Sequence, residues 1–494
     1  MSIGESLLAI DEVRVDPAWA LKIPASLALR KSVLPMCELD GVVQVACCDV
    51  DDQATAQAIR KATSRDVHMI ETDPVELRAV LARIYGGISM PAGVAGPGAR
   101  RGDAAEADDA ATICDEVLLA AVMRDASDIH FLPTETSFKV RLRVDGELET
   151  YRELPKDAHG PVTSRIKVLS GLDIAEKRAP QDGRFNTRIG PNRRKLDLRV
   201  ATLPTRFGER TTMRLLATTS TSLTMEKLGM EDEGIALFRS AINRPHGMIL
   251  LTGPTGSGKS TSLYVALTEL LATRGGNVIT VEDPIEYEIE GASQVEVDGT
   301  DRVSFHRALR SILRHDPDVV MIGEIRDSET ANIAVKASLT GHLVLSTLHT
   351  NTAVGVITRL ADLGLERFLI AATVRMAIAQ RLVRRLCSHC RSPRPMTMTE
   401  ALSLGRRDLE GRTIYDPTGC VYCAGRGYNG RLAMFEMLAI DQELAGMIDD
   451  DADESELVKV IRQAGTPGLI DDAIAKLLGG VTSLPEVLTN VVDF

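Results

Sequence analysis

The stretch that decides the fold is GPTGSGKS at residues 253–260, which matches the phosphate-loop pattern G-x-x-x-x-G-K-[ST]. Apolar residues 248–251 (MILL) precede it and predict a strand. Behind it, leucines recur at helical spacing from Leu263 to Leu271 and predict a helix whose N-terminus points at a bound anion. A glycine-rich turn can arise by chance, but a strand, loop and helix in this order favour a nucleoside triphosphate site.

Each residue type in this loop has a chemical task. The glycines let backbone N–H groups turn inward around phosphate oxygens, Lys259 reaches the terminal phosphates, and the Ser260 hydroxyl can ligate Mg²⁺. The residues predicted to bind nucleotide here are Gly253, Pro254, Thr255, Gly256, Ser257, Gly258, Lys259, Ser260 and Thr261.

Two acidic sites follow predicted strands further along the chain. Residues 278–281 (VITV) lead into Glu282, and residues 319–322 (VVMI) lead into Gly323 and Glu324. Hydrolysis needs a group that orients or deprotonates water, and Mg²⁺ needs oxygen ligands. Because glycine stands where a Walker B strand usually ends in Asp, a water-activating role suits Glu324 better than metal holding. One such carboxylate alone would be interpreted as a residue of a solvated loop at a strand end. Two of them after a phosphate loop indicate catalysis.

A row of arginines lies close to the second acidic site. Residues 305–314 predict a helix that carries Arg307, Arg310 and Arg314 on one face, and Arg326 follows Glu324. Such a face is usually just solvated. Beside a catalytic carboxylate it could instead meet phosphate across a subunit or domain boundary, as an arginine finger does.

Histidines and further arginines complete the candidate site. His342 and His349 flank the predicted strand 343–347, which suggests that a histidine senses the γ-phosphate, although a lone histidine is more often structural. Four arginines on strand-like segments of the preceding domain could form a lid: Arg199, Arg206, Arg210 and Arg214.

Four of the eight cysteines form two pairs, Cys387-x-x-Cys390 and Cys420-x-x-Cys423. This spacing lets two thiolates of each knuckle reach one tetrahedral metal, and a closed four-thiolate site is structural. Zinc is the expected ion. Four free thiols or a redox-active pair are the alternatives, and the paired spacing disfavours both.

Composition shifts divide the chain into a small α/β domain, a linker, a strand-rich α+β domain and a mainly parallel α/β domain. The linker is rich in Gly, Ala and Pro. The predicted segments are residues 1–86, 87–109, 110–225 and 226–494, the last with a cysteine insertion at about 385–426.

The net charge of −12 and the aromatic content of 3% limit the function classes. Nucleic-acid-binding proteins usually carry a basic stripe, and single-strand binders need aromatic platforms, so nucleic acid is not an expected partner. Residues 1–10 lack a basic leader before an apolar run, and no stretch reaches the ~20 apolar residues that span a bilayer. A cytoplasmic protein is therefore expected.

Several of these motifs together resemble those of the bacterial secretion ATPases, also called traffic ATPases. The family's middle domain is similar to residues 127–146 (SDIHFLPTETSFKVRLRVDG), 180–184 (PQDGR) and 199–215 (RVATLPTRFGERTTMRL). Its motor domain is similar to GPTGSGKST, ITVEDPIEY, DPDVVMIGEIRDSETA and TGHLVLSTLHTN, followed by the four cysteines. The chain looks most like the type II secretion branch, which has a short N-terminal domain and a linker.

The resemblance implies a RecA-like motor that hydrolyses ATP with Mg²⁺, and a homohexamer at the cytoplasmic face of the bacterial inner membrane. The N-terminal domain would dock to an inner-membrane platform protein, giving peripheral membrane association, and hydrolysis would drive pseudopilus assembly and protein export. By the family's pattern, Glu282 and Glu324 serve water activation and metal. The residues expected to line the nucleotide site from two domains are Arg199, Arg214, Arg310, Arg314 and Arg326.

Other functions stay open as alternatives. A type IV pilus extension ATPase shares the motor and the cysteines, but usually has a longer N-terminal region. A retraction ATPase lacks the cysteines, and a scaffold that does not hydrolyse ATP should have lost Lys259 or the acidic residues. The first 86 residues lack the RLG-type repeat by which some pilus ATPases bind a cyclic dinucleotide, so that ligand is not expected.

Overall fold

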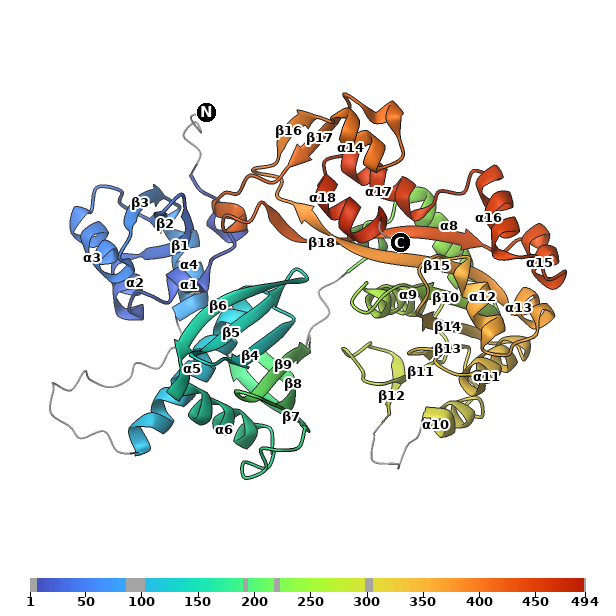
Figure 1. Cartoon of the computed structure of the whole chain (residues 1–494), viewed down its shortest axis with the longest axis horizontal. Coiled ribbons are helices and arrows are strands. Elements are labelled where there is room, and N and C mark those ends of the chain that lie inside the picture. Colours follow the sequence, from blue (N-terminus) through green and yellow to red (C-terminus); the bar gives the residue numbers. More distant parts are fainter. Residues whose placement is uncertain (1–6, 86–102, 190–193, 217–222, 298–304, 493–494) are drawn as a thin grey trace. The chain divides into compact units, whose positions relative to one another are not determined.

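The structure is a computed structural model that describes residues 7–85, 103–189, 194–216, 223–297 and 305–492 (Figure 1). The chain forms two compact units. Unit 1 comprises Met1–Thr218, Cys387–Ser392 and Pro417–Asn429, and unit 2 comprises Thr219–Leu386, Pro393–Asp416 and Gly430–Phe494. The segments that carry the four cysteines therefore group with the N-terminal part of the chain.

The N-terminal domain of unit 1 is a three-stranded sheet with short helices. Strands β1 (Val33–Leu39) and β2 (Val42–Cys47) pair antiparallel, and β3 (Asp66–Glu71) joins β2 in parallel. The hairpin turns at Asp40-Gly41, where both residues have positive φ, as the Asp-Gly pair predicts. The helices are α1 (Pro17–Ala20), α2 (Ala25–Lys31), α3 (Gln53–Thr63) and α4 (Pro74–Tyr85).

A six-stranded antiparallel sheet follows in the order β6-β5-β4-β9-β8-β7. The alternation predicted for β5 (Ser137–Val144) is confirmed, since Phe138, Val140, Leu142 and Val144 are all buried. These residues share one core with helices α5 (Asp103–Met123) and α6 (His159–Leu169). The other strands are β4 (Asp128–Pro133), β6 (Glu147–Pro155), β7 (Gln181–Ile189), β8 (Arg194–Thr205) and β9 (Gly208–Leu216).

One prediction for this region needs correction. Helix α5 begins at Asp103, inside the segment 87–109 that was expected to be a flexible linker. The run DAAEADDAA is rich in alanine and acidic residues, which favour a helix and its first turn over a coil. The rest of the expected linker, and the turn expected at 190–192, lie outside the described residues.

Unit 2 is built on a seven-stranded sheet in the order β12-β11-β13-β14-β10-β15-β18. Strand β10 (Gly247–Thr252) pairs in parallel with both of its neighbours, and all six of its residues are buried. The strands are β11 (Val278–Glu282), β12 (Ala292–Glu296), β13 (Val319–Ile322), β14 (Leu343–Leu348), β15 (Val374–Leu386) and β18 (Tyr428–Ala439). The unbroken run of buried residues in β10 is typical of a parallel strand covered on both faces.

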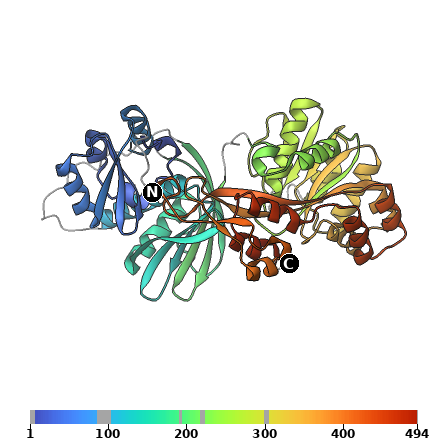
Figure 2. The same cartoon turned by 90° about the horizontal axis from the view of Figure 1, so that it is seen from above.

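Helices cover both faces of this sheet (Figure 2). Ile249 and Leu251 pack with α7 (Met225–Leu228), α8 (Asp232–Ile242) and α9 (Lys259–Thr273). Met248 and Leu250 face the opposite core. That core includes α10 (Phe305–Ile312), α11 (Ser328–Leu339), α12 (Gly355–Asp362), α13 (Arg367–Thr373), α15 (Gln442–Asp449) and α16 (Glu454–Gln463). The predicted α/β class is confirmed.

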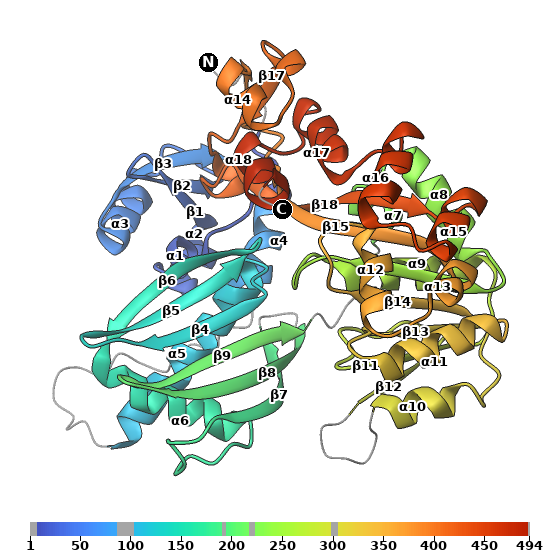
Figure 3. The ribbon, with the colours of Figure 1, turned by 45° about the vertical axis from the view of Figure 1, so that its right-hand side comes forward.

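The C-terminal residues build a second, smaller core in unit 2. Helix α14 (Met398–Ser403) and strand β17 (Thr413–Asp416) pack with α17 (Leu469–Leu478) and α18 (Leu484–Val487), as Figure 3 shows. Arg384, near the end of β15, fastens this core to the sheet through two side-chain hydrogen bonds to Glu486. Across the described residues, no helix is both long and apolar enough to span a bilayer.

Candidate active site and metal centre

The phosphate loop follows directly from the carboxyl end of β10 and leads into α9. Gly253 has φ 146° and leaves no room for a side chain, because a Cβ there would lie 2.4 Å from the Gln380 carbonyl oxygen. Gly258 caps α9 in the left-handed region, with φ 84°. Both glycines are therefore required by close backbone approach and by positive φ. Pro254, Thr255, Gly256 and Ser260 are exposed, so the loop is open to a ligand.

Lys259 is buried at the first turn of α9 and lies against its own loop. Its Nζ donates to the carbonyl oxygens of Gly253 at 2.7 Å and Pro254 at 3.1 Å. Burial, with a smaller contribution from the nearby Arg381 guanidinium, lowers the pKa of Lys259 to about 8. A phosphate bound in the loop would replace these carbonyl partners and favour the charged ammonium.

Two polar residues of β15, which the sequence reasoning missed, brace the loop. Gln380 is buried, donates from Nε2 to the Ser257 carbonyl oxygen at 2.8 Å, and accepts from Ser262 Oγ at 2.8 Å. Its neighbour Arg381 is also buried and donates to the backbone and side-chain oxygens of Asn351, both at 3.2 Å. The polar pair that directly follows the apolar residues 376–379 (MAIA) was the signal that could have revealed them.

Glu324 lies just beyond the end of β13 and meets a residue from the end of β14. His349 Nε2 lies 3.0 Å from one carboxylate oxygen of Glu324, and Arg326 pairs with the other. Burial, followed by the positive charge of Lys259, lowers the pKa of His349, while a backbone hydrogen bond with Gly253 opposes this shift. Glu324 and His349, which the sequence singles out separately, thus come together beside the phosphate loop.

The other predicted carboxylate has a different environment. Glu282 is buried at the end of β11, and Tyr264 donates to one of its oxygens. Its second oxygen accepts from Thr280 Oγ1 at 2.6 Å and Gln294 Nε2 at 3.1 Å. Burial and this carboxylate raise the pKa of the Tyr264 phenol, which stays a donor. Glu282 is 4% exposed and held by three donors, whereas the Glu324 side chain is 22% exposed, so Glu324 is the more accessible of the two to water.

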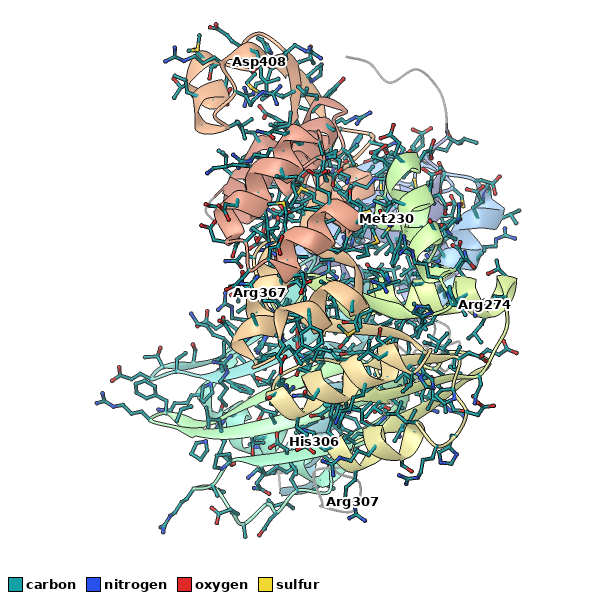
Figure 4. The ribbon with its side chains drawn as sticks, turned by 90° about the vertical axis from the view of Figure 1, so that its right-hand side faces the viewer. Met230, Arg274, His306, Arg307, Arg367 and Asp408 are labelled. Carbon is teal, nitrogen blue, oxygen red and sulfur yellow. The ribbon has the colours of Figure 1, made fainter. Side chains whose placement is uncertain are left out.

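The arginines of α10 and Arg314, just beyond its end, do not contact the phosphate loop within the described contacts. Arg310 pairs with Glu329 of α11 at 2.5 Å, and Arg314 donates to the Arg310 carbonyl oxygen at 3.2 Å. Both are exposed, as is Arg307, which projects away from α10 in Figure 4. The opposite face buries Leu309 and Ile312, as the sequence predicts for an amphipathic helix.

The arginines expected from the preceding domain lie in unit 1. Arg199 of β8 and Arg214 of β9 are direct register partners in the antiparallel sheet. Arg214 Nε donates to Asp128 Oδ1 at 3.0 Å. Their role at the nucleotide stays a prediction.

The four paired cysteines converge on one point. The sulfur atoms of Cys387 and Cys420 lie 3.8 Å apart, as do those of Cys390 and Cys423, and all four lie within 4.8 Å of one another. A tetrahedral Zn²⁺ with bonds of about 2.3 Å places its sulfur ligands about 3.8 Å apart, so the cluster fits zinc. Such a closed site would hold the two knuckles together and leave no position for substrate.

Backbone donors support this thiolate cluster. The N–H groups of Cys420 and Gly427 each donate to Cys423 Sγ at 3.2 Å. The side-chain hydrogen bond from Cys420, together with these N–H groups, lowers the pKa of Cys423, which favours the thiolate that a metal requires.

Comparison with known proteins supplies the family. The model of the "Type II/IV secretion system protein" family matches residues 103–489, and that of the "MshEN domain" matches residues 3–89. The chain belongs to the type II/IV secretion system protein family. The resemblance inferred from the motifs is confirmed.

Named relatives of this secretion family member match most of its length. It is 41% identical over 496 residues to the type II secretion system protein E of Pseudomonas aeruginosa, covering 97% of this chain and 98% of that protein. It is 48% identical to the type II secretion system ATPase E of Vibrio cholerae, covering 78% and 76%. It is 37% identical to the type IV pilus assembly ATPase PilB of Myxococcus xanthus, covering 99% and 89%.

Solved structures share the fold of this family member. The Legionella pneumophila ATPase DotB matches with a TM-score of 0.56 and 25% identity, over 76% of this chain and 94% of DotB. The pilus retraction motor PilT, solved with bound ADP, matches with a TM-score of 0.52 and 26% identity, over 76% and 95%. The predicted RecA-like motor fold is confirmed.

The low pKa of Lys259 predicts that nucleotide binding takes up a proton. Below about pH 8 the ammonium is already charged, whereas above it the phosphates must recruit a proton. ATP affinity should therefore fall by up to about tenfold per pH unit above this value. Titration calorimetry in two buffers of different ionisation enthalpy measures the uptake.

Arg381→Gln provides a second test of this prediction. It removes the neighbouring positive charge that helps to lower the pKa of Lys259, so the midpoint should move to higher pH. Proton-neutral binding throughout the range from about pH 7 to about pH 9 would contradict the assignment.

The cysteine geometry predicts about one zinc ion per chain in reduced, freshly purified protein. Cys420→Ser should lower the metal content about tenfold, because three thiolates no longer close the site. Cys48→Ser, which changes a cysteine outside the cluster, should leave the metal content unchanged. Elemental analysis decides this, and metal-free wild-type protein would refute it.

Proposed function

We propose that this protein is a hexameric ATPase that hydrolyses ATP at the cytoplasmic face of the bacterial inner membrane to drive pseudopilus assembly and protein export by type II secretion. The observation that carries the proposal is the meeting of Glu324 and His349, 3.0 Å apart, beside an exposed phosphate loop. The loop binds phosphate, and a carboxylate that a histidine and an arginine hold in place can activate water.

The chain's own residues divide the work of hydrolysis. Lys259 exchanges the loop carbonyls for the terminal phosphates, and the exposed Ser260 hydroxyl can ligate Mg²⁺, which would neutralise phosphate charge. Glu324 orients the attacking water and takes its proton. His349 lies against Glu324 in the structure and can turn to hydrogen-bond to the γ-phosphate when nucleotide binds.

A neighbouring copy of the chain would complete the site. Arg310 and Arg314 contact α10 and α11 instead of their own phosphate loop. If they stabilise the transition state, they must do so at the loop of another subunit, as a trans arginine finger does. This requirement supports a ring in which Arg199, Arg214 and Arg326 also line the nucleotide.

The similarity to named relatives supports the type II pathway. The relative from Pseudomonas aeruginosa is matched over 97% of this chain, so the N-terminal residues are included. We propose that this N-terminal domain docks to an inner-membrane platform protein and so brings the motor to the membrane. A type IV pilus extension ATPase is the second candidate, because PilB of Myxococcus xanthus is matched over 99% of this chain.

Glu324→Gln should retain ATP affinity within about threefold and lower kcat by about 100-fold or more, because the amide cannot take the proton from water. Lys259→Ala should abolish nucleotide binding. Steady-state phosphate release and fluorescent-nucleotide binding measure the two effects. Glu233→Gln, an exposed carboxylate of α8, is the charge-matched control and should behave as wild type.

Glu282→Gln separates the two acidic sites. If Glu282 mainly fixes the end of β11, its isosteric amide should lower kcat far less than Glu324→Gln does. The opposite order would move the catalytic base to Glu282 and overturn the assignment of Glu324.

The pathway is tested by capture from native cells with the Glu324→Gln chain, which should stay locked with ATP. We expect inner-membrane platform proteins of type II secretion, and we expect their recovery to be lost when residues 1–86 are deleted. Recovery of pilus-assembly proteins would keep the ATPase proposal and replace the pathway.

A further inference from the structure

The cysteine module, residues 387–392 and 417–429, packs on the core of the N-terminal domain within unit 1. Val421, Tyr422 and Ala424 extend the hydrophobic cluster of that domain. The backbone N–H of Arg14 donates to the Tyr422 carbonyl oxygen at 3.2 Å. Gly425 lies so close that a Cβ there would stand 3.2 Å from Leu39 Cδ2. The two parts therefore share a continuous contact.

Beside this apolar contact lies a cluster of buried and half-buried charges, which we term the arginine joint. It draws on the N-terminal domain, the middle domain and the cysteine module. Its members are Arg14, Asp16, Arg124, Asp145, Glu149 and Arg426.

The ion pairs of the arginine joint cross between the three parts. Arg14 of the N-terminal domain pairs with Asp145 at 2.6 Å and donates to the Arg124 carbonyl oxygen at 2.7 Å. Arg124 pairs in turn with Asp16 and, at 3.3 Å, with Glu149. Arg426 of the cysteine module pairs with the same Glu149 oxygen at 2.9 Å. Each part thus depends on a charge supplied by another.

Some hydrogen-bond donors of the arginine joint have no acceptor among the described residues. Arg14 Nε, Arg124 Nε and Arg426 Nη1 are buried and have no hydrogen-bond partner among the described residues. A buried guanidinium nitrogen without a partner loses its water without compensation, so opening the joint would return these donors to solvent. Because closing the joint buries donors that opening would hydrate, the joint is better suited to a contact that opens and closes than to a permanent core.

The thiolate cluster controls the shape of the module's contact surface. Tyr422 lies between Cys420 and Cys423, and Arg426 follows the latter by three residues. The Gly427 N–H donates to Cys423 Sγ at 3.2 Å, which ties the backbone after Arg426 to a metal-binding sulfur. Tyr422 is also stacked on His389 of the first knuckle, with ring centroids 3.8 Å apart. Bringing the knuckles together therefore orders both docking residues.

We propose that the cysteine module is a docking seat for the chain's own N-terminal domain, closed by the arginine joint and opened when the joint or the knuckles are disrupted. In the sequence, the module's first segment directly follows strand β15, which carries Gln380 and Arg381. The N-terminal domain is thereby given a defined, releasable position on the cysteine module. This goes beyond the proposed ATPase function and does not depend on it.

The test is amide hydrogen exchange on the full chain, read at the Arg14 N–H that bonds to Tyr422. Arg426→Gln and, separately, Glu149→Gln should speed this exchange at least tenfold. The double variant should add little to Glu149→Gln alone, because that change already removes the ion pair with Arg426. Arg431→Gln, an exposed arginine a few residues beyond the module, is the matched control and should leave the exchange unchanged.

Amides of the β1–β2 pairing, such as that of Val45, report whether the domain itself stays folded. We expect these to remain protected in every variant. Unchanged exchange at Arg14 in both single variants would overturn the proposal. Loss of protection at Val45 alongside Arg14 would also overturn it, because the joint would then support folding instead of docking.

Removal of metal by a chelator should speed exchange at Arg14 in the wild-type chain to the same extent. Unchanged exchange in demetallated protein would show that the seat forms without metal and would overturn the role given to the knuckles. If elemental analysis finds no zinc at all, the arginine variants still decide whether the joint holds the domain.

Discussion

The parallel pairing of β10 with both of its neighbours is the constraint on which the nucleotide site depends. Because parallel strands end at the same edge of a sheet, the phosphate loop after β10 meets whatever follows β14 and β13. His349 follows β14, and Glu324 follows the end of β13. Thr252 Oγ1, which accepts from the Thr350 N–H at 2.6 Å, locks two of these strand ends together. Glu324 and His349 are thus brought together from distant segments by the order of the strands.

Electrostatics then separate two carboxylates that look alike in sequence. Glu282 ends a strand among hydroxyl and amide donors, which hold its oxygens in place. Glu324 is held by His349 and Arg326, two side chains that are more than half exposed and free to rearrange when phosphate binds. The buried Arg381 adds a positive charge near Lys259, which favours an anion in the phosphate loop.

Sequence reasoning succeeded where local pattern decides the outcome. The run before the phosphate loop, the Asp40-Gly41 hairpin and the amphipathic face of α10 are local properties, and all are confirmed. It failed where tertiary contacts decide. Gln380 and Arg381 gain their place only when β15 pairs with β10, and Glu282 is engaged by donors from other segments. The packing of the cysteine module on the N-terminal domain is likewise invisible in the spacing of its cysteines.

The choice of arginine and carboxylate for the joint has a physical logic. An apolar interface of the same size would hold as firmly, since replacing a buried ion pair by well-packed hydrophobic residues is often neutral or stabilising. Breaking one partner of a buried pair, however, costs about 3–5 kcal/mol, so a charged joint is much more sensitive to the loss of one contact. Glu149 accepts from both Arg124 and Arg426, so loss of its carboxylate would break two ion pairs at once. A partner that offers a competing carboxylate or arginine to this cluster would break its ion pairs directly. An apolar interface contains no single contact that a partner could replace in this way.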